Sequence, residues 1–109
     1  MADAFNDREK GFETKYKLDQ ERLFKAESRR DSLVGQWAAG KLGLSGKAAD
    51  DYVRAVVRSE LDEPGSEDVV RKIKADFDGA KIGVGEAEIR TELYRQMVVA
   101  AEQISKEMS

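Results

Sequence analysis

Apolar residues recur every three or four positions in four stretches of this 109-residue sequence, at residues 19–41, 45–61, 66–79 and 86–108. That spacing places them on one face of an α-helix. The segment between the last two stretches, residues 81–85, is too short to predict a strand. The pattern therefore predicts an all-α protein with four helices.

Each stretch carries a stripe that we expect to face a shared core. Trp37 lies on the first stripe, so a core position is preferred for it over a role as an anchor for a partner protein. Leu93 is expected to occupy a core position in the fourth stretch. The expected inward residues are Leu23, Ala26, Arg30, Leu33, Val34, Trp37, Ala38, Ala49, Tyr52, Val53, Val56, Val69, Val70, Ile73, Phe77, Ile89, Leu93, Met97, Ala100, Ile104 and Met108.

Helix-breaking and helix-capping residues separate the four stretches. Gly40 and Gly43 are expected to end the first helix, and Ser45 to cap the second. The Pro-Gly pair at residues 64–65 is a turn signal, after which Ser66 is expected to cap the third helix. With such short connections, the simplest fold is a four-helix bundle over residues 19–109.

The N-terminal segment differs from the rest of the chain. Residues 1–25 hold six basic and six acidic side chains, closely mixed, with few large apolar residues. Phe5, Phe12, Tyr16 and Leu23 follow steps of seven, four and seven, which align on a helix. The apolar stripe thus extends well before the part of the first helix that the bundle needs.

We predict that residues 1–18 form a mobile N-terminal arm. Gly11 weakens a helix there by ~1 kcal/mol relative to alanine, and an isolated helix of this length is marginal in water. Such a segment is poorly ordered alone and becomes helical against a partner. The alternative is that Phe5, Phe12 and Tyr16 dock on the protein's own bundle as an extension of the first helix.

The composition of the chain argues against several classes of function. Hydrophobic residues make up 40% of the chain and charged residues 38%, with a net charge of −3, no cysteine and no histidine. Without the commonest general base and the commonest metal ligands, we expect neither an enzyme nor a metal site. The interspersed charges do not favour nucleic-acid binding. No signal peptide or membrane-spanning run is expected, so the cytoplasm is the expected compartment.

The glycine-rich segment at residues 40–47 resembles a phosphate-binding loop only superficially. Five residues separate Gly40 from Gly46, where the motif requires four, and Ala48 stands where it requires Ser or Thr. We therefore expect a linker. Weak contact with an adenine nucleotide stays open, because glycine amides, lysines and a helix N-terminus attract anions.

The clustered charges are expected to be structural. The carboxylates at residues 50–51, 62–63 and 67–68 do not have the spacing of a calcium loop, and solvated or capping positions at helix ends are expected for them. The basic pair at residues 29–30 stands between two acidic residues, so a salt-bridged helix face is expected.

Long stretches of the sequence resemble the zeta subunit family, the small ATPase inhibitor proteins of alphaproteobacterial F-type ATP synthases. The most specific stretch contains Phe24-Lys25-Ala26, Arg29-Arg30 and the run from Leu33 to Gly40. The matching stretches are distributed along nearly the whole chain. They are residues 5–10, 12–16, 24–40, 67–69, 73–76 and 89–90.

The resemblance implies a non-catalytic inhibitor of ATP hydrolysis. In that family a mobile arm on a four-helix bundle enters a catalytic interface between the alpha and beta subunits and reaches the gamma rotor. Carried over by position, the partner-binding residues are Phe5, Arg8, Glu9, Lys10, Phe12 and Tyr16. The implied location is cytoplasmic, at the inner membrane through the ATP synthase and without insertion into the bilayer.

Two other functions stay open at this point. The chain could be an adenine-nucleotide-binding sensor that uses residues 40–47 or a groove of the bundle. It could also be an assembly factor that binds the same complex without inhibiting it. No cofactor is expected for any of these functions.

Overall fold

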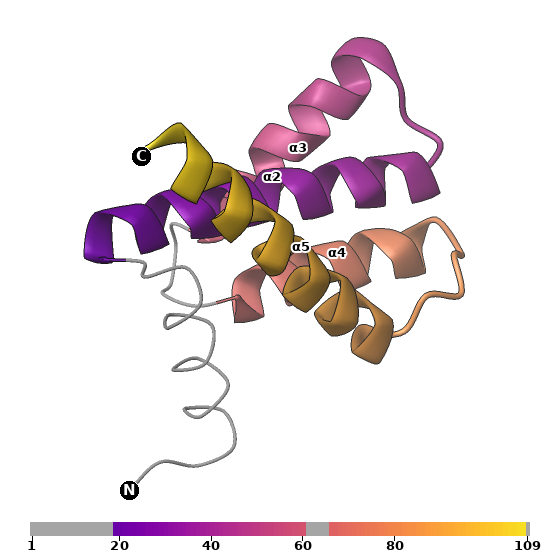
Figure 1. Ribbon diagram of the computed structural model, residues 1–109. Helices are drawn as coiled ribbons and strands as arrows, with labels where there is room; N and C mark the ends of the chain where they lie inside the picture. Colours follow the sequence, from indigo (N-terminus) through magenta and orange to yellow (C-terminus); the bar gives the residue numbers. More distant parts are fainter. Residues whose placement is uncertain (1–18, 61–65, 109) are drawn as a thin grey trace, which may run out of the picture.

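A computed structural model describes residues 19–60 and 66–108 of the chain. In these residues the chain forms four helices and no strand: α2 (Gln20–Lys41), α3 (Gly46–Glu60), α4 (Glu67–Gly79) and α5 (Glu86–Glu107) (Figure 1). The predicted all-α fold with four helices is confirmed, and the observed bounds lie close to the predicted ones. The predicted arm, residues 1–18, lies outside the described residues.

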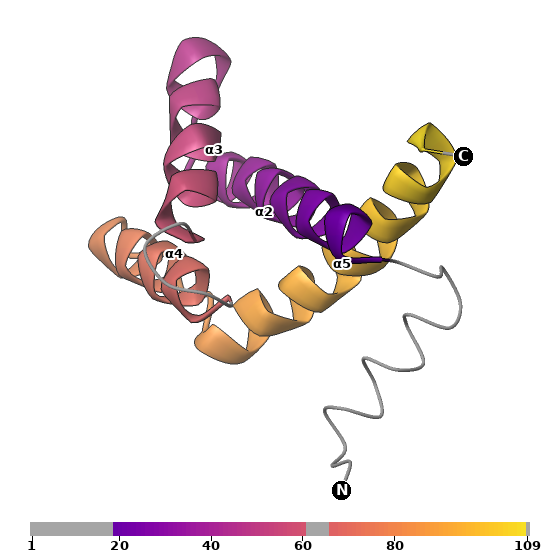
Figure 2. The same ribbon diagram turned by 90° about the vertical axis from the view of Figure 1, so that its left-hand side faces the viewer.

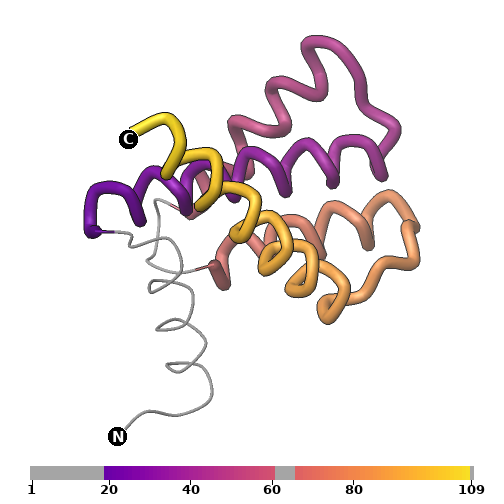
Figure 3. The backbone as a smooth tube through the Cα atoms, in the orientation of Figure 1, coloured from indigo at the N-terminus to yellow at the C-terminus, as the bar shows by residue number. Residues whose placement is uncertain are grey.

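The central helix of the bundle is α2. It packs against α5 along one side and against α3 along another, while α4 packs against both α3 and α5 (Figures 1 and 2). The tube in Figure 3 shows that the chain turns at the same end of the view after α2 and after α4. The larger cluster of buried side chains includes residues of all four helices.

Glycine ends α2 as its sequence predicts. The N–H of Gly43 donates to the carbonyl of Gly40 at 3.1 Å, and the N–H of Leu44 donates to that of Ala39 at 2.9 Å. This pair of bonds is a Schellman motif, and it requires a left-handed residue at Gly43, where φ is +76°. At the other end of α2, the Asp19 carboxylate accepts from the N–H of Arg22 at 2.9 Å.

The predicted serine caps are only partly correct. Ser66 does stand directly before α4, but its side chain makes no capping hydrogen bond. Its ψ of 3° departs from the extended backbone that a capping serine normally adopts, which accounts for the missing bond. Ser45 directly precedes α3, and its carbonyl accepts from the N–H of Ala49 at 3.4 Å.

The core forms two clusters. The larger one joins all four helices and contains Val34, Ala38, Val56, Val69, Val70, Ile73, Phe77, Ile89 and Leu93. The smaller one joins the first half of α2 to the second half of α5 through Ala26, Ala100 and Ile104. Leu93 is buried as predicted. Trp37 is half-buried, and its ring packs edge-on against Phe77 with the ring centroids 5.7 Å apart.

Candidate partner-binding site

All six residues that the sequence predicts to bind a partner lie outside the described residues. They are Phe5, Arg8, Glu9, Lys10, Phe12 and Tyr16. The structure therefore neither brings them together nor separates them. It does describe the place where the predicted arm joins the bundle, at Asp19 and the first turns of α2.

One large apolar side chain stands exposed at this junction. Phe24 lies in the second turn of α2 and keeps 64% of its surface accessible, whereas Leu23 beside it is half-buried. Phe24 was not among the predicted site residues. Its position in the sequence could have indicated this exposure. Phe24 follows Leu23 directly and therefore lies beside the apolar stripe that runs from Leu23 to Ala26.

The same turns of α2 are fastened to the end of α5. Arg22 donates from Nη2 to the backbone carbonyl of Met108 at 3.0 Å. Arg29 forms a two-pronged ion pair with Glu107, at 2.9 Å for each nitrogen, and donates to Gln103 at 2.6 Å. This hydrogen-bonded pair raises the pKa of Arg29 and lowers that of Glu107. The first half of α2 is thus fastened to the end of α5.

Arg30 is salt-bridged, as predicted for the basic pair, but it lies in a buried charged cluster that also includes a carboxylate of α3. Its Nε donates to Oδ1 of Asp31 at 2.9 Å, and its Nη2 forms an ion pair with Glu60 of α3. Asp31 is fully buried and Arg30 is nearly so. The pairing with Glu60 was not predicted, because that carboxylate comes from a helix that is distant in sequence.

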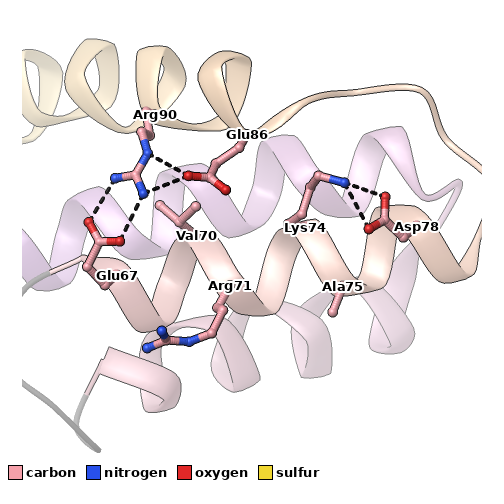
Figure 4. Close-up of a pocket in the computed structure, with 8 residues that line it drawn as sticks. All are labelled: Glu67, Val70, Arg71, Lys74, Ala75, Asp78, Glu86 and Arg90. Carbon is pink, nitrogen blue, oxygen red and sulfur yellow. Dashed lines mark hydrogen bonds and ion pairs between the residues drawn. The ribbon is translucent and has the colours of Figure 1, made fainter.

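A charged pocket of about 300 Å³ lies between α4 and α5 (Figure 4). Arg90 reaches across it to both oxygens of Glu67, at 2.8 and 2.9 Å, and also donates to Glu86. Lys74 donates to Asp78 at 2.7 Å. These cations are already paired with carboxylates, so an anionic ligand would have to displace those carboxylates. The pocket therefore does not favour the nucleotide-sensor alternative.

The hydroxyl of Tyr52 has a structural role between two helices. Burial, followed by a hydrogen bond to Asp76 at 2.8 Å, raises the pKa of Tyr52. The hydroxyl therefore stays protonated and links α3 to α4, with the ammonium of Lys72 lying 5.1 Å from the ring centroid.

Within residues 19–60 and 66–108, no group of three or more acidic side chains is arranged to hold a metal ion. No helix there is long and apolar enough to cross a membrane.

Comparisons with known proteins place this geometry in a wider context. A family model described as ATPase inhibitor subunit zeta matches residues 1–103, which include the predicted arm. A solved structure described as "Solution NMR structure of the protein" is 44% identical to this chain, with a TM-score of 0.67. That match covers 78% of this chain and 96% of the other. No curated protein sequence matches.

Proposed function

We propose that this chain, which belongs to the ATPase inhibitor subunit zeta family, inhibits ATP hydrolysis by an F-type ATP synthase as a steric wedge. The observation that carries the proposal is that the family model matches the arm as well as the bundle. In this proposal residues 1–18 enter an interface between alpha and beta subunits and contact the gamma rotor. The bundle stays outside as a handle, and the protein itself catalyses no reaction.

The chemistry of the arm suits a crevice between subunits. Phe12 and Tyr16 are one helical turn apart and supply an apolar anchor when the arm is helical. The charged residues at 8–10, together with Phe5, are proposed to meet complementary charges and an apolar pocket on the partner. The location that follows is cytoplasmic, at the inner membrane through the ATP synthase.

Phe24 extends this proposed surface into the described part of the chain. A helix that continued from the arm into α2 would place Phe12, Tyr16, Gln20 and Phe24 at successive intervals of four residues. Residues at that interval form a ridge along a helix surface. Because Phe24 is exposed and its helix is anchored to α5, its ring is available to the rim of the same crevice.

The deciding experiment measures ATP hydrolysis by the purified catalytic head with and without the full-length protein. We expect hydrolysis to fall as the protein is added. A double variant, Phe12→Ala with Tyr16→Ala, should inhibit more weakly while its helical circular dichroism stays unchanged. If the full chain binds the head without slowing hydrolysis, it is an assembly factor and the proposal is wrong.

A further inference from the structure

Three charged side chains meet inside the interface between α2 and α3. Arg30 and Asp31 come from the middle of α2, and Glu60 is the last residue of α3. Their side chains keep only 10%, 0% and 18% of their surface accessible, respectively. Arg30 bridges the two acids, donating to Oδ1 of Asp31 and to Oε1 of Glu60.

The charges of this cluster do not balance when both acids are ionised. One guanidinium then faces two carboxylates, and Glu27 of α2 adds a further negative field at Asp31. The end of α3 is also the negative end of its helix dipole, which disfavours a carboxylate at Glu60. Burying an unpaired charge is costly, so the cluster favours the uptake of one proton.

A buried oxygen atom without a hydrogen bond from the described residues marks the acceptor that the added proton could reach. Oδ2 of Asp31 is buried and accepts no hydrogen bond from the described residues. Nη2 of Arg30 contacts both Oδ1 of Asp31, at 2.9 Å, and Oε1 of Glu60, so the two carboxyl groups converge on one nitrogen atom at the interface. Two ionised carboxylates have no donor between them, whereas a protonated Glu60 supplies one to Asp31.

We propose that Asp31 and Glu60 share one proton across the α2–α3 interface, so that a carboxyl–carboxylate hydrogen bond fastens the end of α3 to α2 and is lost when both groups ionise. The protein then carries a pH-sensitive fastening between two of its helices. This device does not depend on the proposed inhibition of an ATPase.

The direction of the pH effect follows from the titration of Glu60. Burial first, and then the hydrogen bond to Asp31, raise the pKa of Glu60 from 4.5 to about 7, while the field of Arg30 opposes the shift. Burial likewise raises the pKa of Asp31. Between pH 4.5 and about 7, Glu60 binds a proton in the folded chain more often than in the unfolded chain. The stability that Glu60 contributes through the fastening is therefore fully present below pH 4.5, falls as the pH rises from 4.5 and is lost above about 7.

Carbon-13 NMR of the side-chain carboxyls in the full-length protein tests the shared proton directly. We expect the Glu60 signal to titrate with a midpoint near 7. Glu67 and Glu107, whose pKa values are lowered by Arg90 and Arg29, are internal controls that should titrate below 4.5 in the same spectra. A Glu60 midpoint at or below 4.5 overturns the proposal.

Amide hydrogen exchange tests the fastening itself. After correction for intrinsic exchange rates, protection in the last turn of α3 should fall roughly tenfold between pH 6 and pH 8, since one pKa unit corresponds to a factor of ten. In Glu60→Gln the side-chain amide can donate to Asp31 at every pH, so this fall should disappear. Amides near Ile104 in α5 serve as the control region. An equal fall in the wild type and in Glu60→Gln contradicts the proposal.

Discussion

The ends of α2 and α4 have the same backbone conformation and differ in the residue that adopts it. Both helices end in the same pair of hydrogen bonds, in α4 from Lys81 to Asp78 at 3.1 Å and from Ile82 to Phe77 at 2.8 Å. The left-handed position of this motif is Gly43 after α2 but Lys81 after α4, where φ is +59°. A lysine carries a Cβ that is crowded in this conformation, so the end of α4 stores strain that the end of α2 does not.

Replacing Lys81 with glycine should therefore stabilise the protein by ~1 kcal/mol, because the left-handed conformation costs an L-residue about that much. Urea unfolding monitored by circular dichroism measures the change. The matched variant Gly43→Ala should destabilise the protein by a similar amount, since it introduces the same strain at φ +76°. Equal stability of Lys81→Gly and the wild type would show that the lysine is not strained.

Two phenylalanines differ in burial and therefore in their expected contribution to stability. Phe77 is fully buried and contacts Trp37, whereas Phe24 is 64% exposed. Phe77→Ala should lower the free energy of unfolding by ~3–5 kcal/mol, the usual cost of truncating a buried aromatic side chain. Phe24→Ala should change it by less than ~0.5 kcal/mol, as surface substitutions usually do. Thermal unfolding of the two variants decides the matter, and a large loss in Phe24→Ala would place that ring in the core.

At the scale of the helices, α2 and α3 approach each other closely at Gly35. A Cβ added there would lie 3.2 Å from the backbone Cα of Val53 and 3.4 Å from Cβ of Val56. Gly35→Leu should therefore force the helices apart and destabilise the protein by ~1–3 kcal/mol, the range for overpacked cores. Gly40→Ala is the control, since that position faces open space and should gain up to ~1 kcal/mol in helix propensity. Chemical denaturation that leaves Gly35→Leu as stable as the wild type would refute the close approach.

Periodicity predicted the helices well and the buried charges poorly. The stripe of α4, for example, was predicted from Val69, Val70, Ile73 and Phe77, and all four are buried. Glu92 is buried in α5, where Arg95 and Gln96 of the same helix satisfy its oxygens at 2.6 and 2.7 Å. Asp31 is also buried, and its partner Arg30 pairs in turn with Glu60 of α3. Apolar spacing identifies the face that a helix buries, but whether a charge on that face finds a partner depends on the fold.

The candidate site was predicted less completely than the fold. The partner-binding residues of the arm were predicted from the resemblance to the zeta subunit family, and they lie outside the described residues. Only Phe24 is seen in the structure, and its exposure depends on which side of α2 is covered by α3 and α5. Two neighbouring apolar residues, Leu23 and Phe24, look alike in the sequence. Packing of the whole bundle decides which of them is exposed.

At the scale of the whole molecule, the bundle can act as a rigid base for the arm. Arg22 and Arg29 fasten the start of α2 to the end of α5, and the core clusters continue along α2 to its other end. The described helices therefore share stabilising contacts of their own, and the proposed mechanism assigns binding of the partner to residues 1–18.

Removing the arm should separate folding from inhibition. A chain that starts at Lys17 keeps Asp19, which caps α2, and both core clusters, so its helical circular dichroism and cooperative unfolding should match those of the full chain. It should nevertheless fail to suppress ATP hydrolysis by the matching catalytic head, because Phe5, Phe12 and Tyr16 are absent. Inhibition by the full chain should weaken at higher salt, since the charged residues at 8–10 are proposed to pair with the partner. Full inhibition by the shortened chain would place the inhibitory surface on the bundle, with exposed Phe24 as the first position to test.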